Sequence, residues 1–365
     1  MTEAVSRNDF LNELKQRQQR VDAYLAAPRF RDWFGPDRLA NAIFAYVKRS
    51  GKRLRPGVLL FACGAAGGEE EDALPAAAAV ELFHTWTLVH DDLIDNDHLR
   101  RGSPTVHQHA ADCARTVFGC SAAEARDYGR DVAVLAGDVQ QAWSIALLLE
   151  VAATGRVDPA LVVQLGRKLT AEVTPNLIRG EMLDVEYGFL PLASLSEREI
   201  LEMLRLKTGV LYEFAGLAGA CIGARRPPDN PGVAADIAAF TGLCGTAFQL
   251  QDDILGITGD EVALGKPVGS DLREGKRTTI VLHAFARASA AQRRFLNDVL
   301  GRPDVGAGEL TAARDLLLEL GGVEHTAVLA RAYLDRALQH LEAVPESRYK
   351  ALLRRWADFM VSRSF

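Results

Sequence analysis

Apolar residues recur at three- and four-residue spacing through most of the chain, and helix-breaking residues are confined to short islands. This spacing is typical of one face of an α-helix, whereas half-buried strands show strict alternation. The main breaks fall at residues 64–68, 224–232 and 301–304, and none of them resembles a long linker. We therefore expect an all-α fold in a single domain that covers residues 1–365.

The expected helices follow from this spacing and from the breaks between them. They cover residues 9–26, 39–50, 56–65, 73–96, 129–152, 159–183, 197–220, 233–255, 278–287, 290–300, 309–320, 326–341 and 346–362. Residues 111–126 are polar and include Gly119 and two cysteines, so we expect a loop insertion there.

Charge and cysteine content exclude several classes of protein. The net charge of -6 argues against a nucleic-acid binder and against electrostatic docking to an anionic membrane. The five cysteines are odd in number and show no CxxC spacing, which indicates neither a disulfide framework nor a zinc site. Residues 1–20 lack the apolar core of a signal peptide, and no stretch has the roughly 20 apolar residues of a spanning helix. We expect a cytoplasmic protein.

Two aspartate clusters, Asp91-Asp92-Leu93-Ile94-Asp95 and Asp252-Asp253, lie within apolar runs. An ionised carboxylate away from water needs a counter-charge, most often a metal ion. Asp91 and Asp95 lie one helical turn apart on the same face and can grip one ion. A solvated helix end is the alternative, which the apolar Leu93 and Ile94 disfavour. Oxygen ligands of this kind suit Mg²⁺, which also binds substrate phosphates.

Basic residues lie close to both clusters in a chain that is acidic overall. Lys52 and Arg55 precede the first cluster by one helix, and Arg100 and Arg101 follow it directly. Three further lysines, Lys207, Lys266 and Lys276, lie on either side of the second cluster. Taken singly, each is most often a surface charge, but together they favour the binding of an anion that a metal bridges.

Several motifs follow one another between residues 51 and 279. They are Gly51-Lys52-Arg53-Leu54-Arg55-Pro56, His90-Asp91-Asp92-Leu93-Ile94-Asp95, Arg100-Arg101-Gly102-Ser103-Pro104-Thr105, Phe248-Gln249-Leu250-Gln251-Asp252-Asp253, Gly265-Lys266-Pro267 and Asp271-Leu272-Arg273-Glu274-Gly275-Lys276-Arg277-Thr278. In this order and spacing, the chain resembles the trans-prenyl diphosphate synthases (polyprenyl synthetases), and its pattern is closest to the geranylgeranyl and farnesyl diphosphate synthases.

The resemblance implies a helical bundle around a deep central cavity and, usually, a homodimer. Residues 1–50 would form N-terminal helices, 51–280 would carry the catalytic motifs, and 281–365 would form C-terminal helices. The two aspartate motifs would face each other across the mouth of the cavity. By this resemblance, Asp91 and Asp95 bind Mg²⁺ from one wall and Asp252 binds it from the other.

The resemblance also assigns the polar residues of the motifs to two diphosphate groups. The diphosphate of isopentenyl diphosphate would be held by Lys52, Arg55, His84 and Arg101. The allylic diphosphate, or its leaving pyrophosphate, would contact Arg100, Lys207, Thr208, Gln249, Lys266 and Lys276. The catalytic set would then be Asp91, Asp95, Asp252, Lys207 and Lys266.

The implied reaction joins isopentenyl diphosphate to an allylic diphosphate, which is dimethylallyl, geranyl or farnesyl diphosphate. Three Mg²⁺ ions, the usual number in this family, make the allylic diphosphate a good leaving group. The alkene of isopentenyl diphosphate attacks the allylic cation, and a proton is then lost. An apolar cavity keeps water away from this cation.

Trp86 and Thr87, which precede Asp91 in the sequence, bear on the length of the product. Thr87 lies one turn earlier on the same face, about 6 Å deeper along the helix axis, and leaves room for a growing chain. Trp86 projects to one side, and simple core packing is its alternative role. A bulky residue followed by a smaller one resembles the synthases of C20 geranylgeranyl diphosphate, which is the expected product. C15 farnesyl diphosphate is the alternative, and longer chains come third.

One position departs from the family pattern, because many relatives have a third aspartate where this chain has Gly256. We do not expect the helix to continue past Gly256 and Gly259, so Asp260 would not compensate.

Two other classes of protein remain as alternatives. A terpene cyclase binds a single diphosphate and has no use for Lys52, Arg55 and Arg101. A non-catalytic partner subunit would be expected to lack one or both aspartate motifs, and this chain has both.

Overall fold

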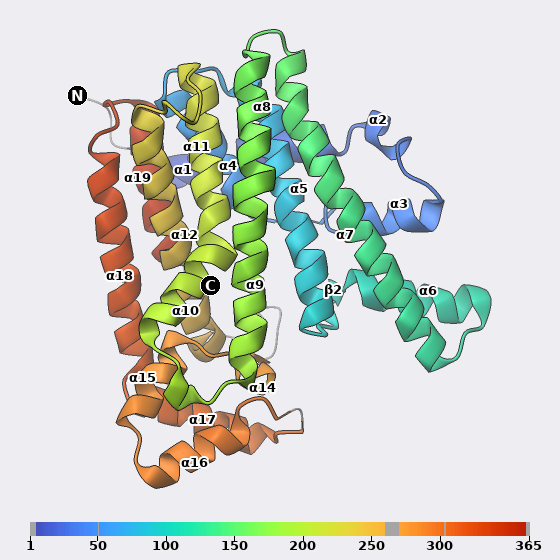
Figure 1. The fold of residues 1–365 in the computed structure, drawn as a ribbon, viewed down its shortest axis with the longest axis vertical. Coiled ribbons are helices and arrows are strands. Elements are labelled where there is room, and N and C mark those ends of the chain that lie inside the picture. Colours follow the sequence, from blue (N-terminus) through green and yellow to red (C-terminus); the bar gives the residue numbers. More distant parts are fainter. Residues whose placement is uncertain (1–4, 50, 260–269, 303, 363–365) are drawn as a thin grey trace. The chain divides into compact units, whose positions relative to one another are not determined.

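The computed structural model describes residues 5–49, 51–259, 270–302 and 304–362, which form helices and one short hairpin (Figure 1). The all-α prediction is confirmed. Unit 1 and unit 2 are two compact parts of the chain. Unit 1 comprises Met1–Arg167, Ala215–Ala235 and Pro345–Leu353, and unit 2 comprises Lys168–Phe214, Asp236–Val344 and Arg354–Phe365. The single-domain organisation stays a prediction.

The helices before residue 169 include the one that carries the first aspartate motif. They are α1 (Arg7–Leu25), α2 (Pro28–Arg31), α3 (Asp37–Phe44), α4 (Leu54–Ala65), α5 (Glu70–Ile94), α6 (Val106–Phe118), α7 (Ala122–Ala153) and α8 (Pro159–Lys168). Strands β1 (Leu99–Arg100) and β2 (Ser103–Pro104) pair antiparallel between α5 and α6, with Arg100 opposite Ser103.

The later helices include the one that carries the second aspartate motif. They are η1 (Leu169–Val173), α9 (Thr174–Phe189), η2 (Leu192–Ser194), α10 (Glu197–Leu204), η3 (Arg205–Gly209), α11 (Val210–Ala224), α12 (Val233–Thr258), α14 (Ser270–Glu274), α15 (Thr279–Arg287), α16 (Ala290–Val299), α17 (Ala307–Glu319), α18 (Gly322–Leu341) and α19 (Arg348–Val361).

Residues 111–118 and 122–126 are helical, so the predicted loop insertion is wrong. Helix α6 ends at Gly119, whose φ of 68° lies in the left-handed region that glycine tolerates. Helix α7 starts three residues later with a capping box, in which the Ser121 side chain accepts from the Glu124 N–H and the Glu124 carboxylate accepts from the Ser121 N–H. The polar character of this segment therefore reflects helix ends and exposed helix faces.

Two predicted helices, 159–183 and 197–220, are each interrupted by one π-helical turn. The turns are η1 and η3. Such turns insert one extra residue into a helix and occur often at functional sites. Turn η3 contains two of the predicted diphosphate-binding residues, Lys207 and Thr208.

Helices α5 and α7 pack against each other in unit 1, with α4 and α6 beside them. The contact is close because α7 has glycine where α5 approaches: a β-carbon on Gly137 would lie 2.0 Å from His90 Nε2. This packing holds the end of α5, which carries the first aspartate motif.

A second hydrophobic core lies in unit 2. Buried side chains of α15, α16 and α17 form one cluster that includes Ile280, Leu296 and Leu317, and Ile254 and Ile257 of α12 join it. The segment with the second aspartate motif is therefore anchored by apolar residues that follow the motif.

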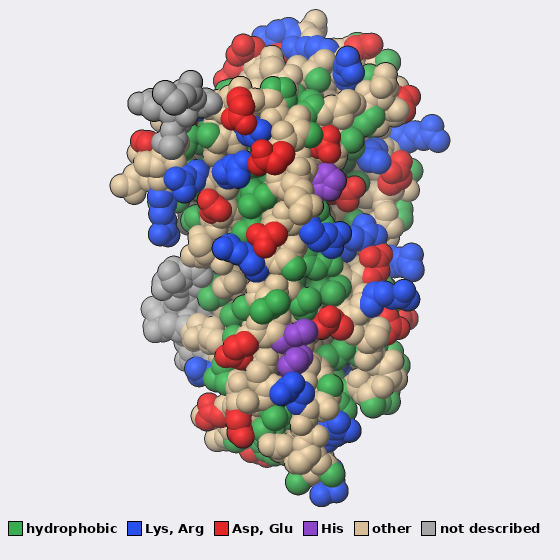
Figure 2. All heavy atoms as spheres, turned by 90° about the vertical axis from the view of Figure 1, so that its left-hand side faces the viewer, with side chains coloured by type: hydrophobic (Ala, Val, Ile, Leu, Met, Phe, Trp, Pro, Cys, Tyr) green, Lys and Arg blue, Asp and Glu red, His purple; other side chains and the backbone are tan. Residues whose placement is uncertain are grey.

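Two of the described helices, α7 and α12, are long and apolar enough to span a membrane by length and composition alone. Buried residues make up 50% and 61% of their most apolar windows, as in core helices. On the face that Figure 2 shows, basic and acidic side chains are interspersed.

Candidate active site

The first aspartate motif ends helix α5. Asp91 lies in the last turn, and Asp95 is the C-cap, whose N–H donates to the Asp91 carbonyl at 2.8 Å. The two carboxylates are thus one turn apart, and both residues are partly exposed. The apolar neighbours do not shield this turn as expected, since Ile94 is 50% exposed.

Asp92, between them, has a different environment. It is fully buried and accepts hydrogen bonds from the Tyr46 hydroxyl and from Arg100, whose Nε lies 2.6 Å from Oδ1. The Arg100 Nη2 also lies 3.4 Å from a carboxylate oxygen of Asp91 and of Asp97. Asp92 therefore points away from any ion that Asp91 and Asp95 would share, as the helical geometry predicts.

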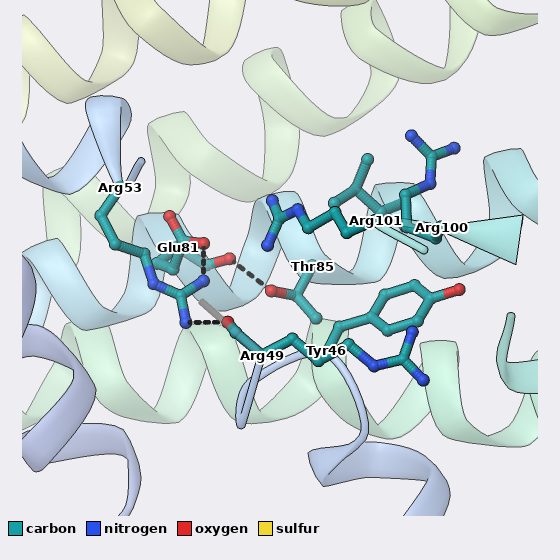
Figure 3. Close-up of a pocket in the computed structure, with 8 residues that line it drawn as sticks. Tyr46, Arg49, Arg53, Glu81, Thr85, Arg100 and Arg101 are labelled. Atoms are coloured by element: carbon teal, nitrogen blue, oxygen red, sulfur yellow. Dashed lines mark hydrogen bonds and ion pairs between the residues drawn. The ribbon is translucent and has the colours of Figure 1, made fainter. Parts of the chain in front are cut away.

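A narrow pocket in unit 1 lies beside this turn (Figure 3). Its lining is Tyr46, Arg49, Arg53, Glu81, Thr85, Leu88, Arg100 and Arg101. Arg53 is buried and bonds to Glu81 and, at 2.8 Å, to Asp22. Its charge is therefore neutralised within the protein.

Arg101 packs against the start of the Gly-Lys-Arg segment. A β-carbon on Gly51 would lie 2.6 Å from the Arg101 Nη1, so a side chain at this position would displace the guanidinium group. Arg101 itself has a left-handed backbone with a φ of 54°. The structure therefore brings the first two basic motifs together.

His84 lies on α5 between these basic residues. Its pKa is lowered well below the usual value by burial and by the positive charges of Arg55, Arg101, Arg100 and Arg53. The neutral imidazole adds no charge to a region that already holds several arginines. Such a concentration of positive charge suits an anionic ligand. Lys52, just before α4, is exposed.

The second aspartate motif lies near the end of α12 in unit 2. Asp252 is partly buried, whereas Asp253 is buried and accepts from Gln249 Nε2 at 3.1 Å. The side-chain Oε1 of Gln249 in turn accepts from the Thr208 hydroxyl at 3.0 Å. Burial, Asp271 and Asp252 raise the pKa of Asp253 well above its usual value. Two of the predicted allylic-site residues, Thr208 and Gln249, are thus in contact.

Helix α12 ends at Thr258. It passes Gly256 but not Gly259, so the prediction that it does not continue past both glycines is confirmed. Asp260 and Lys266 lie outside the described residues.

Turn η3 places Lys207 against helix α9. The Lys207 ammonium lies 2.6 Å from Asp184 Oδ2 and 2.9 Å from Glu181 Oε2. Gly180 permits the approach, because a β-carbon there would lie 2.3 Å from the Lys207 backbone nitrogen. Lys276, after α14, lies 3.2 Å from Glu274 Oε2.

The two aspartate motifs belong to different units. Over the described parts of the chain, no three or more His, Cys, Asp or Glu side chains come together in a geometry that could hold a metal ion. The donors of the motifs themselves are carboxylate oxygens, which suit Mg²⁺. Within the described residues, Asp253 Oδ2 is buried and has no hydrogen-bond partner, which is consistent with a nearby cation.

The two residues predicted to set product length lie on different faces of α5. Trp86 is buried, packs edge-on against Phe83 at 4.9 Å and donates from Nε1 to His90 Nδ1 at 3.2 Å. His90 in turn rests on Gly137 of α7. The Thr87 hydroxyl donates to the His84 carbonyl at 2.8 Å. Trp86 thus packs within α5 on the side where His90 meets α7.

Three polar residues of these sites escaped the sequence predictions. They are Tyr46, Glu181 and Asp184. Glu181 and Asp184 carry a usable signal, since they lie three residues apart on one helix face. Tyr46 carries none, because nothing in the sequence shows that it reaches Asp92.

Comparisons with known proteins show which family the chain belongs to. The family model for polyprenyl synthetase matches residues 36–317. A geranylgeranyl diphosphate synthase of Methanosarcina mazei is 34% identical over 355 residues, which are 97% of this chain and 98% of the relative. A geranylfarnesyl diphosphate synthase of Aeropyrum pernix is 33% identical over 336 residues, covering 90% of this chain and 95% of the relative.

Solved structures show the same fold. The geranylgeranyl pyrophosphate synthetase of Pyrococcus horikoshii has a TM-score of 0.82 at 29% identity, covering 98% of this chain and 99% of that chain. The polyprenyl synthase of Caulobacter crescentus, complexed with calcium and isoprenyl diphosphate, has a TM-score of 0.78 at 28% identity, covering 100% and 99%. The protein therefore belongs to the polyprenyl synthetase family and is a prenyltransferase.

Proposed function

We propose that the protein condenses isopentenyl diphosphate with an allylic diphosphate to make a trans-prenyl diphosphate, with C20 geranylgeranyl diphosphate as the main product. The allylic substrate is dimethylallyl, geranyl or farnesyl diphosphate. The observation that carries this proposal is the concentration of arginines around the uncharged His84, beside the first aspartate motif. An elongating enzyme needs such a second diphosphate site, whereas a cyclase does not.

In this proposal, isopentenyl diphosphate is held by Lys52, Arg55, His84 and Arg101. The allylic diphosphate is held by Arg100, Lys207, Thr208, Gln249, Lys266 and Lys276. The contact between Thr208 and Gln249 supports the second group. With both substrates bound, these residues place the alkene beside the allylic carbon and so make the attack effectively unimolecular.

Asp91, Asp95 and Asp252 hold Mg²⁺ in this proposal, with three ions in each site. Bound Mg²⁺ supplies the charge neutralisation that lets the allylic diphosphate leave. The carboxylate donors and the calcium in the Caulobacter crescentus structure support a divalent metal. The surrounding lysines and arginines add fixed positive charge at the leaving pyrophosphate, which takes up the proton that the product loses.

Relatives named for C20 and for longer geranylfarnesyl products both resemble this chain. The small side chain of Thr87, one turn below Asp91, supports a product longer than C15. C15 and chains longer than C20 are the alternatives.

We also propose that the protein is a cytoplasmic homodimer. Helix α9 supports the dimer, because it exposes Ile178, Met182 and Phe189, the last by 86%. Beside Ile178 and Met182 lies a mainly apolar groove of about 590 Å³. Exposed apolar faces of this kind mark contacts with another chain or ligand-binding grooves, and we assign this one to the partner subunit. Light scattering of the purified protein should give twice the mass of the chain, and a monomeric mass would contradict the dimer.

The activity can be tested with Mg²⁺, isopentenyl diphosphate and each allylic primer, followed by sizing of the dephosphorylated products. A C20 alcohol is expected. Turnover that does not consume isopentenyl diphosphate would favour a cyclase.

Asp91→Ala and Asp252→Ala should each lower kcat by at least about 10³-fold, since carboxylate ligands of a catalytic metal are lost. Circular dichroism should show the fold intact. Asp315→Ala, on the exposed face of α17, is the matched control and should keep full activity. Retained activity in the first two variants would contradict the metal assignment.

A further inference from the structure

Tyr46 lies between α3 and α4, and its hydroxyl group connects two other segments. The side chain is buried. Its O–H donates to Asp92 Oδ2, and its oxygen accepts from the Val106 N–H at 3.2 Å. Val106 is the first residue of α6, where backbone N–H groups have no partner within the helix. The hydroxyl therefore joins the end of α5 to the start of α6.

Asp92 passes this connection on to Arg100. Its two oxygens are divided, since Oδ2 accepts from Tyr46 and Oδ1 accepts from Nε and Nη2 of Arg100. Two bonds from a planar guanidinium group to one carboxylate fix the orientation of that group. Arg100 itself lies on the two-residue strand β1, and its ion pair with Asp92 is shorter than those with Asp91 and Asp97.

We propose that Tyr46 is a positioning residue for the allylic diphosphate. Through Asp92 it sets the place and orientation of the Arg100 guanidinium beside the first aspartate motif, and it does not touch the substrate itself. This inference rests on the proposed function, in which Arg100 binds the allylic diphosphate. The side chains of Tyr46 and Arg100 line the same pocket (Figure 3).

A water molecule cannot take over the hydrogen bonds of the Tyr46 hydroxyl, because the hydroxyl lies in the protein interior. Asp92 is 0% exposed, so water cannot take the place of a missing O–H without opening the protein. With phenylalanine at this position the ring still fills the core, but Asp92 Oδ2 and the Val106 N–H each lose a partner. A buried group left without a partner is destabilised, which favours a rearrangement that gives it a new one. The carboxylate is then free to rotate, and Arg100 moves with it.

The variant Tyr46→Phe tests this inference. The KM for the allylic diphosphate should rise about tenfold, the scale of one lost hydrogen bond to a charged group. The KM for isopentenyl diphosphate should change less than about threefold, because only Arg100 is displaced. Equal changes in both KM values would overturn the inference, since a general structural loss has that effect.

The chain offers a matched control in Tyr24. Its hydroxyl donates to the Glu150 carboxylate, which also accepts from Arg29 at 2.7 Å. A tyrosine, a carboxylate and an arginine thus meet here as they do at Tyr46, but outside the aspartate motif. Tyr24→Phe should leave both KM values unchanged. A tenfold rise in this control as well would remove the support that Tyr46→Phe gives.

A double-mutant cycle with Arg100→Ala tests whether Tyr46 acts through Arg100. In the Arg100→Ala background, Tyr46→Phe should not raise the allylic KM further, and an additive rise would overturn the inference. Urea unfolding of the wild-type protein, the two single variants and the double variant should show that the two losses in the free energy of unfolding do not add. If no primer is elongated, the proposed function fails, but the unfolding cycle still decides the coupling: additivity there overturns the inference.

Discussion

The carboxylate of Asp271 lies in the space that the missing side chain of Gly256 leaves on α12. A β-carbon on Gly256 would come within 2.7 Å of Asp271 Oδ2. Gly256 is the position at which many relatives carry the third aspartate of the second motif. In this protein a carboxylate therefore reaches nearly the same place, but it comes from α14.

Gly256→Asp, which restores the usual motif, should destabilise this protein. The new β-carbon displaces Asp271, and the new carboxylate repels it, so the free energy of unfolding should fall by about 1–3 kcal/mol. Urea unfolding in metal-free buffer measures this. The double variant Gly256→Asp/Asp271→Ala should recover most of the loss. If the two substitutions simply add, the two positions do not share one space.

The uncharged His84 makes stability depend on pH. Its pKa is lowered in the folded protein by burial and by nearby arginines, so below about pH 6.5 the unfolded chain binds a proton that the folded protein does not. The free energy of unfolding should therefore fall as pH drops from about 6.5 toward the lowered pKa, and stay level above that window. The slope is at most about 1.4 kcal/mol per pH unit for one proton.

His84→Gln should reduce this slope, and urea unfolding at several pH values measures it. His109→Gln, at an exposed position on α6, is the control and should leave the slope unchanged. Equal slopes in the wild-type protein and in His84→Gln would show that His84 is not the group responsible.

The sequence predicted the fold class, most helices and the places of the basic and acidic motifs, because these depend on local periodicity and on short patterns. It missed α6, since exposed polar faces and a glycine at residue 119 resemble a loop. It did not foresee the π-helical turn at Lys207, which arises where α9 and α12 approach that turn through glycines. Contacts between distant residues, such as Tyr46 with Asp92, leave no mark on the local pattern.

Lys207 should contribute to stability as well as to substrate binding. Its ammonium is the partner of both Glu181 and Asp184, and all three side chains are mostly buried. Lys207→Met keeps the apolar stem but leaves two carboxylates close together, so the free energy of unfolding should fall by about 1–3 kcal/mol. Lys168→Met, which removes an exposed pair with Glu172, is the control and should change it by less than about 0.5 kcal/mol. A similar small change for Lys207→Met would mean that Glu181 and Asp184 do not depend on it.

Product length should respond to Thr87 and not to Trp86. Trp86 is fixed by Phe83 and His90 on the face of α5 that contacts α7. Trp86→Ala should therefore lower the free energy of unfolding by about 3 kcal/mol through the cavity it leaves, while the product stays C20. Thr87→Phe fills the space one turn below Asp91 and should shift the main product to C15. Chromatography of the dephosphorylated products measures both, and a longer product from Trp86→Ala would place Trp86 at the floor of the product cavity instead.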